Sequence, residues 1–138
     1  MLFRSLSLGL ALNSSGSAEV MVNLLIQYTE GADPMFGLVL LFILTLLLTS
    51  LITNAAAVSI MFPIALELGN QLEQPLTPFF VAIAFAASGD FMTPIGYQTN
   101  LMVMGPGNYK FKDYFVIGFP LTLIYAVVVL IFINWYYL

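Results

Sequence analysis

The chain has 138 residues, of which 61% are hydrophobic and only 7% charged, and its formal net charge is −4. Soluble domains carry about 25% charged residues, so we expect lipid to solvate most of this chain, as in an all-α integral membrane protein. The absence of cysteine and histidine excludes disulfides and zinc–thiolate sites, and three basic residues are too few for a nucleic-acid-binding surface.

The first 30 residues are predicted to form a truncated helix followed by an amphipathic helix. The apolar run from Leu2 to Leu12 is shorter than the roughly 20 residues that a membrane-crossing helix needs. In residues 18–30, four polar side chains recur at helical spacing among apolar ones: Glu19, Asn23, Gln27 and Glu30. A second interpretation is a weak signal peptide ending near Ala18. We favour a chain that begins inside a helix whose upstream half is missing.

Residues 35–70 are predicted to form a re-entrant helical hairpin. The apolar block from Met35 to Leu68 is too long for one comfortable crossing and too short for two. Its middle carries side chains that satisfy backbone groups in lipid or bind ions: Thr45, Thr49, Ser50, Thr53 and Asn54. We expect two short helices, 35–51 and 56–68, joined by a polar tip. The alternative is one long tilted helix whose hydroxyls bond back to the preceding turn.

Residues 77–104 are predicted to form a helix that is broken in the middle of the membrane. With a rise of about 1.5 Å per residue, a helix that starts near Pro78 is roughly mid-bilayer at Asp90. The octapeptide that follows is polar and helix-breaking: Thr93-Pro94-Ile95-Gly96-Tyr97-Gln98-Thr99-Asn100. Lipid offers backbone groups no partners, so such a break survives only inside protein or beside a watery cavity. Transporters hold ions and substrates at breaks of this kind.

Residues 114–136 are predicted to be the last membrane-spanning helix, with an aromatic interfacial anchor at 135–137. Lys110 and Lys112 lie in the loop before it, whereas the connections expected on the other side of the membrane carry no lysine or arginine. The positive-inside rule therefore predicts that residues 105–113 lie in the cytoplasm. The carboxyl terminus is then outside, and the tip of the hairpin points inward.

Four motifs carry a family resemblance: Thr53-Asn54-Ala55-Ala56-Ala57, Met61-Phe62-Pro63-Ile64-Ala65, the octapeptide with Leu101-Met102-Val103, and Gly105-Pro106-Gly107-Asn108-Tyr109. Together they resemble the second half of the divalent-anion:sodium symporters, in the branch of sulfate- and citrate-transporter-like permeases. The likeness begins near Gly9 and covers nearly the whole chain. It implies the second half of an inverted-repeat transporter, in which each repeat supplies a re-entrant hairpin and a broken helix.

The resemblance implies a transporter and not an enzyme. The expected activity is secondary active transport: sodium-coupled symport of a divalent anion, sulfate or a di- or tricarboxylate, across the plasma (bacterial inner) membrane by a multi-pass protein. Sodium is the expected coupling ion, with no other cofactor. The expected partners are the missing amino-terminal repeat, a second copy in a homodimer, the lipid bilayer and the small anion. The alternatives are an inactive or split fragment and a non-transporting membrane scaffold subunit.

The resemblance also assigns residues to the site. Sodium is expected to bind side chains of the hairpin and backbone carbonyls of the broken helix: Thr49, Thr53, Asn54, Met92 and Pro94. The anion is expected to contact Asn54, Ala55 and Thr93. These roles are chemically sensible, because sodium prefers neutral oxygens freed where a helix unwinds. An oxyanion is attracted to a helix amino terminus such as the one expected near Ala56.

Two positions depart from the family pattern. Ala55 lacks the polar group that relatives place at the third position of the tip motif, which leaves the identity of the anion open. Asp90 stands where relatives have a small serine-like residue. A carboxylate there would attract a cation and repel a dianion, so Asp90 is a candidate for coupling, to protons as well as sodium, or for anion selectivity. The alternative is that Asp90 faces a wet vestibule or caps the break.

Overall fold

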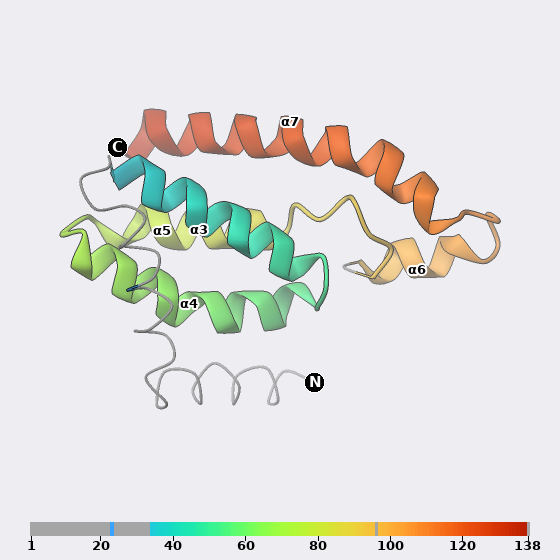
Figure 1. Cartoon of the computed structure of the whole chain (residues 1–138), viewed down its shortest axis with the longest axis horizontal. Helices are drawn as coiled ribbons and strands as arrows, with labels where there is room; N and C mark the ends of the chain where they lie inside the picture. Colours follow the sequence, from blue (N-terminus) through green and yellow to red (C-terminus); the bar gives the residue numbers. More distant parts are fainter. Residues whose placement is uncertain (1–22, 24–33, 96, 138) are drawn as a thin grey trace.

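The computed structural model describes residues 34–95 and 97–137, together with Asn23, and their regular secondary structure is helical, with no strand among them. The expected truncated and amphipathic helices at the amino terminus lie outside the described residues, except for Asn23, which is helical and exposed. Figure 1 shows the five helices, which run in chain order as follows: α3 (Pro34–Thr49), α4 (Asn54–Gln71), α5 (Leu76–Ala87), α6 (Gln98–Met104) and α7 (Phe111–Tyr137).

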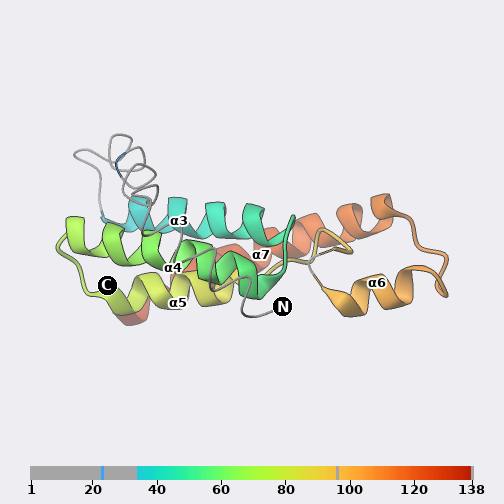
Figure 2. The same cartoon turned by 90° about the horizontal axis from the view of Figure 1, so that it is seen from below.

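Helices α3 and α4 form a hairpin and pack side by side (Figure 2). Pro34 occupies the first helical position of α3, where the missing N–H of proline costs no helical hydrogen bond. The turn of 50–53 reverses the chain, and Thr53 caps α4 by accepting a hydrogen bond from the Ala56 N–H at 3.4 Å. The chain therefore folds back at the polar middle of the block 35–68, as the hairpin prediction required, and one long tilted helix is excluded.

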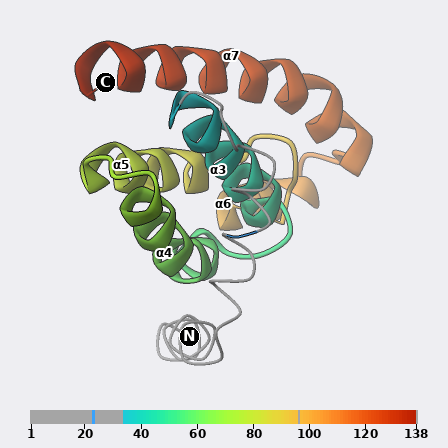
Figure 3. The same cartoon turned by 60° about the vertical axis from the view of Figure 1, so that its left-hand side comes forward.

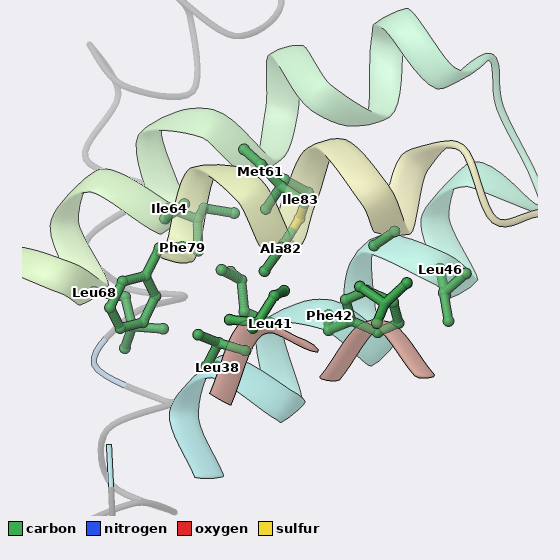
Figure 4. Close-up of a cluster of buried hydrophobic side chains, with 14 residues drawn as sticks. Leu38, Leu41, Phe42, Leu46, Met61, Ile64, Leu68, Phe79, Ala82 and Ile83 are labelled. Carbon is green, nitrogen blue, oxygen red and sulfur yellow. The ribbon is translucent and has the colours of Figure 1, made fainter. Parts of the chain in front are cut away.

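The hydrophobic core lies between α3, α4 and α5 (Figure 4). Its fully buried side chains come from the facing stripes of these helices and include Leu38, Leu41, Phe42, Met61, Ile64, Leu68 and Phe79. Helix α7 crosses the bundle on another side (Figure 3) and adds Val129 and Ile133 to the same core. This packing fixes α5 between the hairpin and α7.

The chain leaves helical geometry after Ala87 and resumes it at Gln98. We call the described residues between these points, 88–95 and Tyr97, the break. The expectation that the whole octapeptide lies outside a helix is wrong for its last three residues. The Tyr97 carbonyl accepts hydrogen bonds from the Asn100 and Leu101 N–H groups at 3.1 and 3.3 Å, and these bonds start α6 earlier than expected.

Helix α7 is the one described helix that is long and apolar enough to cross a membrane, with 27 residues. Its buried residues follow one narrow stripe, which consists of Gly118, Thr122, Val129 and Ile133. Most of its other side chains are exposed apolar ones. Helices α3 and α5 are also apolar but shorter, with 16 and 12 residues.

Candidate functional site

The hairpin tip touches the end of α5 through the Thr49 hydroxyl. Thr49 is fully buried, and its Oγ1 lies 2.9 Å from Asn54 Oδ1 and 3.0 Å from the Ala87 carbonyl oxygen. Ala87 is the last residue of α5, so its carbonyl has no helical N–H to pair with. Three oxygens from three helices, a hydroxyl, a carboxamide and a carbonyl, thus converge at one point.

A second cluster joins the tip to the break through Asp90, which is fully buried. Asp90 Oδ1 accepts hydrogen bonds from the Ser50 hydroxyl at 3.1 Å and from the Met92 N–H at 3.2 Å. Asp90 Oδ2 lies 2.8 Å from the Thr93 hydroxyl, which also lies 3.0 Å from the Ser50 carbonyl oxygen. The carboxylate therefore connects the hairpin tip to its own loop.

The two clusters contain more oxygen contacts than hydrogens. Thr49, Ser50 and Thr93 each carry one hydroxyl hydrogen, yet each hydroxyl oxygen lies within 3.1 Å of two acceptor oxygens. Each hydrogen is therefore shared between two acceptors or bonds to only one of them. Oxygen lone pairs gather at these two clusters, and lone pairs of this kind are what a hard cation binds.

The expected sodium ligands lie in two places in the structure, the hairpin tip and the break. It brings Thr49 and Asn54 into direct contact. Thr53 is exposed, and its hydroxyl oxygen is used as the cap of α4. Met92 is half-buried with its N–H directed at Asp90, and Pro94 is buried one residue beyond Thr93.

The expected anion contacts lie close to the same clusters. Asn54 and Ala55 occupy the first turn of α4, where helix N–H groups lack helical partners. Ala55 is exposed, so its contribution to anion binding is limited to its backbone N–H. The Thr93 hydroxyl faces the hairpin, through its contact with the Ser50 carbonyl.

Sequence reasoning did not assign a role in the site to Ser50, Asn100 or Tyr114. The Ser50 side chain and carbonyl both contact the break. The Asn100 amide donates to the Thr93 carbonyl at 3.3 Å, and the Tyr114 hydroxyl donates to the Asn100 carbonyl at 2.9 Å. There was a reason in the sequence to consider Ser50, because Ser50 lies in the polar tip. There was no such reason for Tyr114, whose neighbours are aromatic and charged residues.

Comparison with known proteins identifies the family. The model of the "Sodium:sulfate symporter transmembrane region" matches residues 2–138. The chain belongs to this family. The symporter family and the apolar α7 indicate a membrane protein, and the family consists of transporters and not of enzymes.

Three relatives illustrate the range of similar proteins. An uncharacterized transporter of Synechocystis is 44% identical over 118 residues, which are 85% of this chain and 19% of the relative. Probable sodium/sulfate cotransporter 3 of Chlamydomonas reinhardtii is 39% identical over 129 residues, which are 91% of this chain and 14% of the relative. A sodium-dependent dicarboxylate transporter of Staphylococcus saprophyticus is 29% identical over 126 residues, 89% of this chain and 24% of the relative.

The chain thus spans a quarter or less of the length of these three curated relatives. No solved structure matches it significantly. The geometry of the tip and the break therefore comes from this chain alone.

Proposed function

We propose that this chain forms the carboxyl-terminal part of a sodium-coupled symporter that carries a divalent anion, sulfate or a di- or tricarboxylate, across the plasma membrane. The protein would be multi-pass, with α3 and α4 as a re-entrant hairpin and α5 and α6 as the two halves of one broken membrane helix. The family and the names of its curated relatives support this proposal.

The observation that carries the proposal is the convergence of Thr49, Asn54 and the Ala87 carbonyl at the hairpin tip. Sodium requires neutral oxygens from several chain segments, and this point offers three of them from different helices. In the proposed site, the carbonyls of Met92 and Pro94 and the Thr53 oxygen complete the ligands. Sodium binding would join the hairpin to the break and so prepare the site for the anion.

The anion would bind at the amino terminus of α4, where Asn54 and the Ala55 N–H face the tip, with Thr93 on the other side. Asp90 would affect the relative affinities of the site for sodium and for the anion. Its negative charge favours a cation and opposes a dianion, and it is fully buried next to both. We therefore assign Asp90 to coupling or to anion selectivity.

The proposed site also needs partners. One hairpin and one broken helix provide one wall of a substrate site, so a second, inverted repeat would supply the opposite wall. A second copy of the transporter would complete a homodimer. The exposed apolar residues of α7 would face lipid.

Uptake by the purified intact protein in proteoliposomes tests the proposed function. Labelled sulfate and succinate are supplied under an inward gradient of sodium or of potassium. We expect one of the two anions to be taken up, and only under the sodium gradient. Asn54→Ala should reduce that uptake to background, because it removes the carboxamide next to Thr49. Asn70→Ala is the matched control, since Asn70 is an exposed asparagine on the same helix.

Three outcomes contradict the proposal. Equal uptake with sodium and potassium removes sodium as the coupling ion. Unchanged uptake by Asn54→Ala removes the tip from the site. No uptake of either anion by the intact protein favours a scaffold role over transport.

A further inference from the structure

The break packs against α7, and the closest approach is at Gly118. A Cβ atom added to Gly118 would overlap the Phe91 carbonyl oxygen and would lie only 2.8 Å from Met92 Cα. These neighbours are backbone atoms, which cannot rotate out of the way as a side chain can. The absence of a side chain at Gly118 therefore determines how near the break lies to α7.

Hydroxyl groups of α7 also contact the backbone that precedes Phe91. The Tyr125 hydroxyl donates to the Phe85 carbonyl at 2.8 Å, and the Thr122 hydroxyl lies 3.5 Å from the Gly89 carbonyl. The Phe85 carbonyl also accepts the Ser88 N–H at 3.0 Å, so the Tyr125 hydroxyl is a second donor at the point where α5 ends. These contacts connect the end of α5 and the start of the break to α7.

Beyond the contact at Gly118, α7 reaches the site through two hydrogen bonds in series. Tyr114 donates to the Asn100 carbonyl, and the Asn100 amide donates to the carbonyl of Thr93. A groove of about 360 Å³ opens between α6 and α7 and is lined by Phe91, Asn100, Tyr114 and Gly118, among others. Gly118 and Tyr114 thus contact the carboxyl-terminal part of the break and the start of α6, the part of this region that borders the groove.

We propose that Gly118 is a positioning residue for the sodium site, acting through Phe91 and Met92, and that Tyr114 has the same role through Asn100. This inference rests on the proposed function, because it assumes that the Met92 carbonyl is a sodium ligand. A functional site tolerates errors of about 0.5 Å in the position of its groups. A methyl group at Gly118 would force a backbone displacement of that order, since real Cβ contacts are essentially never shorter than 3.0 Å.

Binding of labelled sodium to the purified intact protein tests the positioning role. We expect Gly118→Ala to raise the half-saturating sodium concentration at least tenfold, with an unchanged number of sites. Alanine favours a helix by about 1 kcal/mol over glycine, so weaker binding cannot be attributed to a weaker α7. Gly105→Ala is the control, because a Cβ there meets no atom within 4 Å.

A second variant keeps the test informative where Gly118→Ala fails to fold. Tyr114→Phe removes one hydroxyl without adding bulk, and we expect it to raise the half-saturating sodium concentration about threefold. Tyr136→Phe is its control, as Tyr136 is an exposed tyrosine near the other end of α7. A purely structural role would lower the amount of folded protein without changing sodium affinity.

The outcomes separate the two proposals. The positioning role is overturned if the parent protein binds sodium saturably and Gly118→Ala has the same half-saturating sodium concentration. Where Tyr114→Phe alone folds, the same result in that variant overturns it. In either case the proposed function still stands. A parent protein that binds no sodium contradicts the proposed function itself, and the positioning role with it.

Discussion

The break has two faces that use different chemistry. Toward the hairpin, its contacts are made by polar groups: the Asp90 carboxylate accepts from the Ser50 hydroxyl, and the Thr93 hydroxyl lies 3.0 Å from the Ser50 carbonyl oxygen. Toward α7, its contacts are backbone packing of Phe91 and Met92 against Gly118 and the edge-to-face contact of the Phe91 and Tyr125 rings. One unwound segment thus contacts the hairpin through polar groups and α7 through packing. We expect substitutions on the hairpin face to change what is bound, and substitutions on the α7 face to change how well it is bound.

The largest effect is expected from Thr49→Val, which removes the hydroxyl between Asn54 and Ala87 and keeps the shape of the side chain. Loss of a hydrogen-bonding oxygen that faces a charge costs about 2 kcal/mol, so the half-saturating sodium concentration for uptake should rise about 30-fold. Thr45→Val is the control, because the buried Thr45 hydroxyl bonds only to the Leu41 carbonyl of its own helix in the contacts described. Equal effects of the two variants would remove Thr49 from the sodium site.

A smaller effect is expected from Asp90→Asn, which keeps the size of the side chain and an oxygen for Ser50 and Met92. The negative charge is lost, so sodium should bind about tenfold more weakly, which corresponds to about 1.4 kcal/mol, and the KM for the anion should fall. Uptake kinetics with varied sodium and varied anion measure the two effects separately. Glu73→Gln, at an exposed position, is the control. Unchanged values for both cargoes would limit Asp90 to a structural role.

On the α7 face, Tyr125→Phe should raise the half-saturating sodium concentration only about fivefold. The variant removes one hydrogen bond, to the Phe85 carbonyl, and a typical bond of this kind contributes about 1 kcal/mol. The edge-to-face contact of the ring with Phe91 is retained. Sodium titration of uptake is the measurement, and the maximal rate and the preference between sulfate and succinate should stay the same. A changed preference would mean that α7 also determines which anion binds.

The smallest effect is expected from Ala55→Thr, which restores a polar group at the tip. Ala55 is exposed, so the larger side chain is tolerated there. One additional hydroxyl at the amino terminus of α4 should lower the KM for the anion about threefold, at an unchanged half-saturating sodium concentration. Competition between sulfate and succinate shows which anion gains. An effect on sodium alone would place position 55 with the cation ligands.

The sequence predicts the helical class because its apolar blocks are long and its polar interruptions are short, and for the described residues this class is confirmed. The fold-back of the chain near Thr53 and Asn54 follows from the same pattern. Whether this hairpin re-enters a membrane stays a prediction. The start of α6 is missed because Gln98 and Thr99 give no local helix signal, and a tertiary context sets the first turn.

The site is only partly visible from the sequence. The pairing of Thr49 with Asn54 joins positions five residues apart, and a motif at a turn predicts it. Ser50 and Asp90 are 40 residues apart, and no local pattern connects them. The role of Gly118 could not be predicted from the sequence. A glycine in an apolar helix has no recognisable role until the backbone packed against it is known.

The short length of α5 has an electrical consequence. Its 12 residues rise about 18 Å, and the hydrocarbon core of a bilayer is about 30 Å thick. With Leu76 near one surface, a sodium ion that reaches the end of α5 from that side has passed through about 0.6 of the membrane potential. Each 100 mV then contributes about 1.4 kcal/mol to its binding, or a tenfold change in affinity. In the proposed symporter, the membrane potential would therefore change the occupancy of this position by sodium.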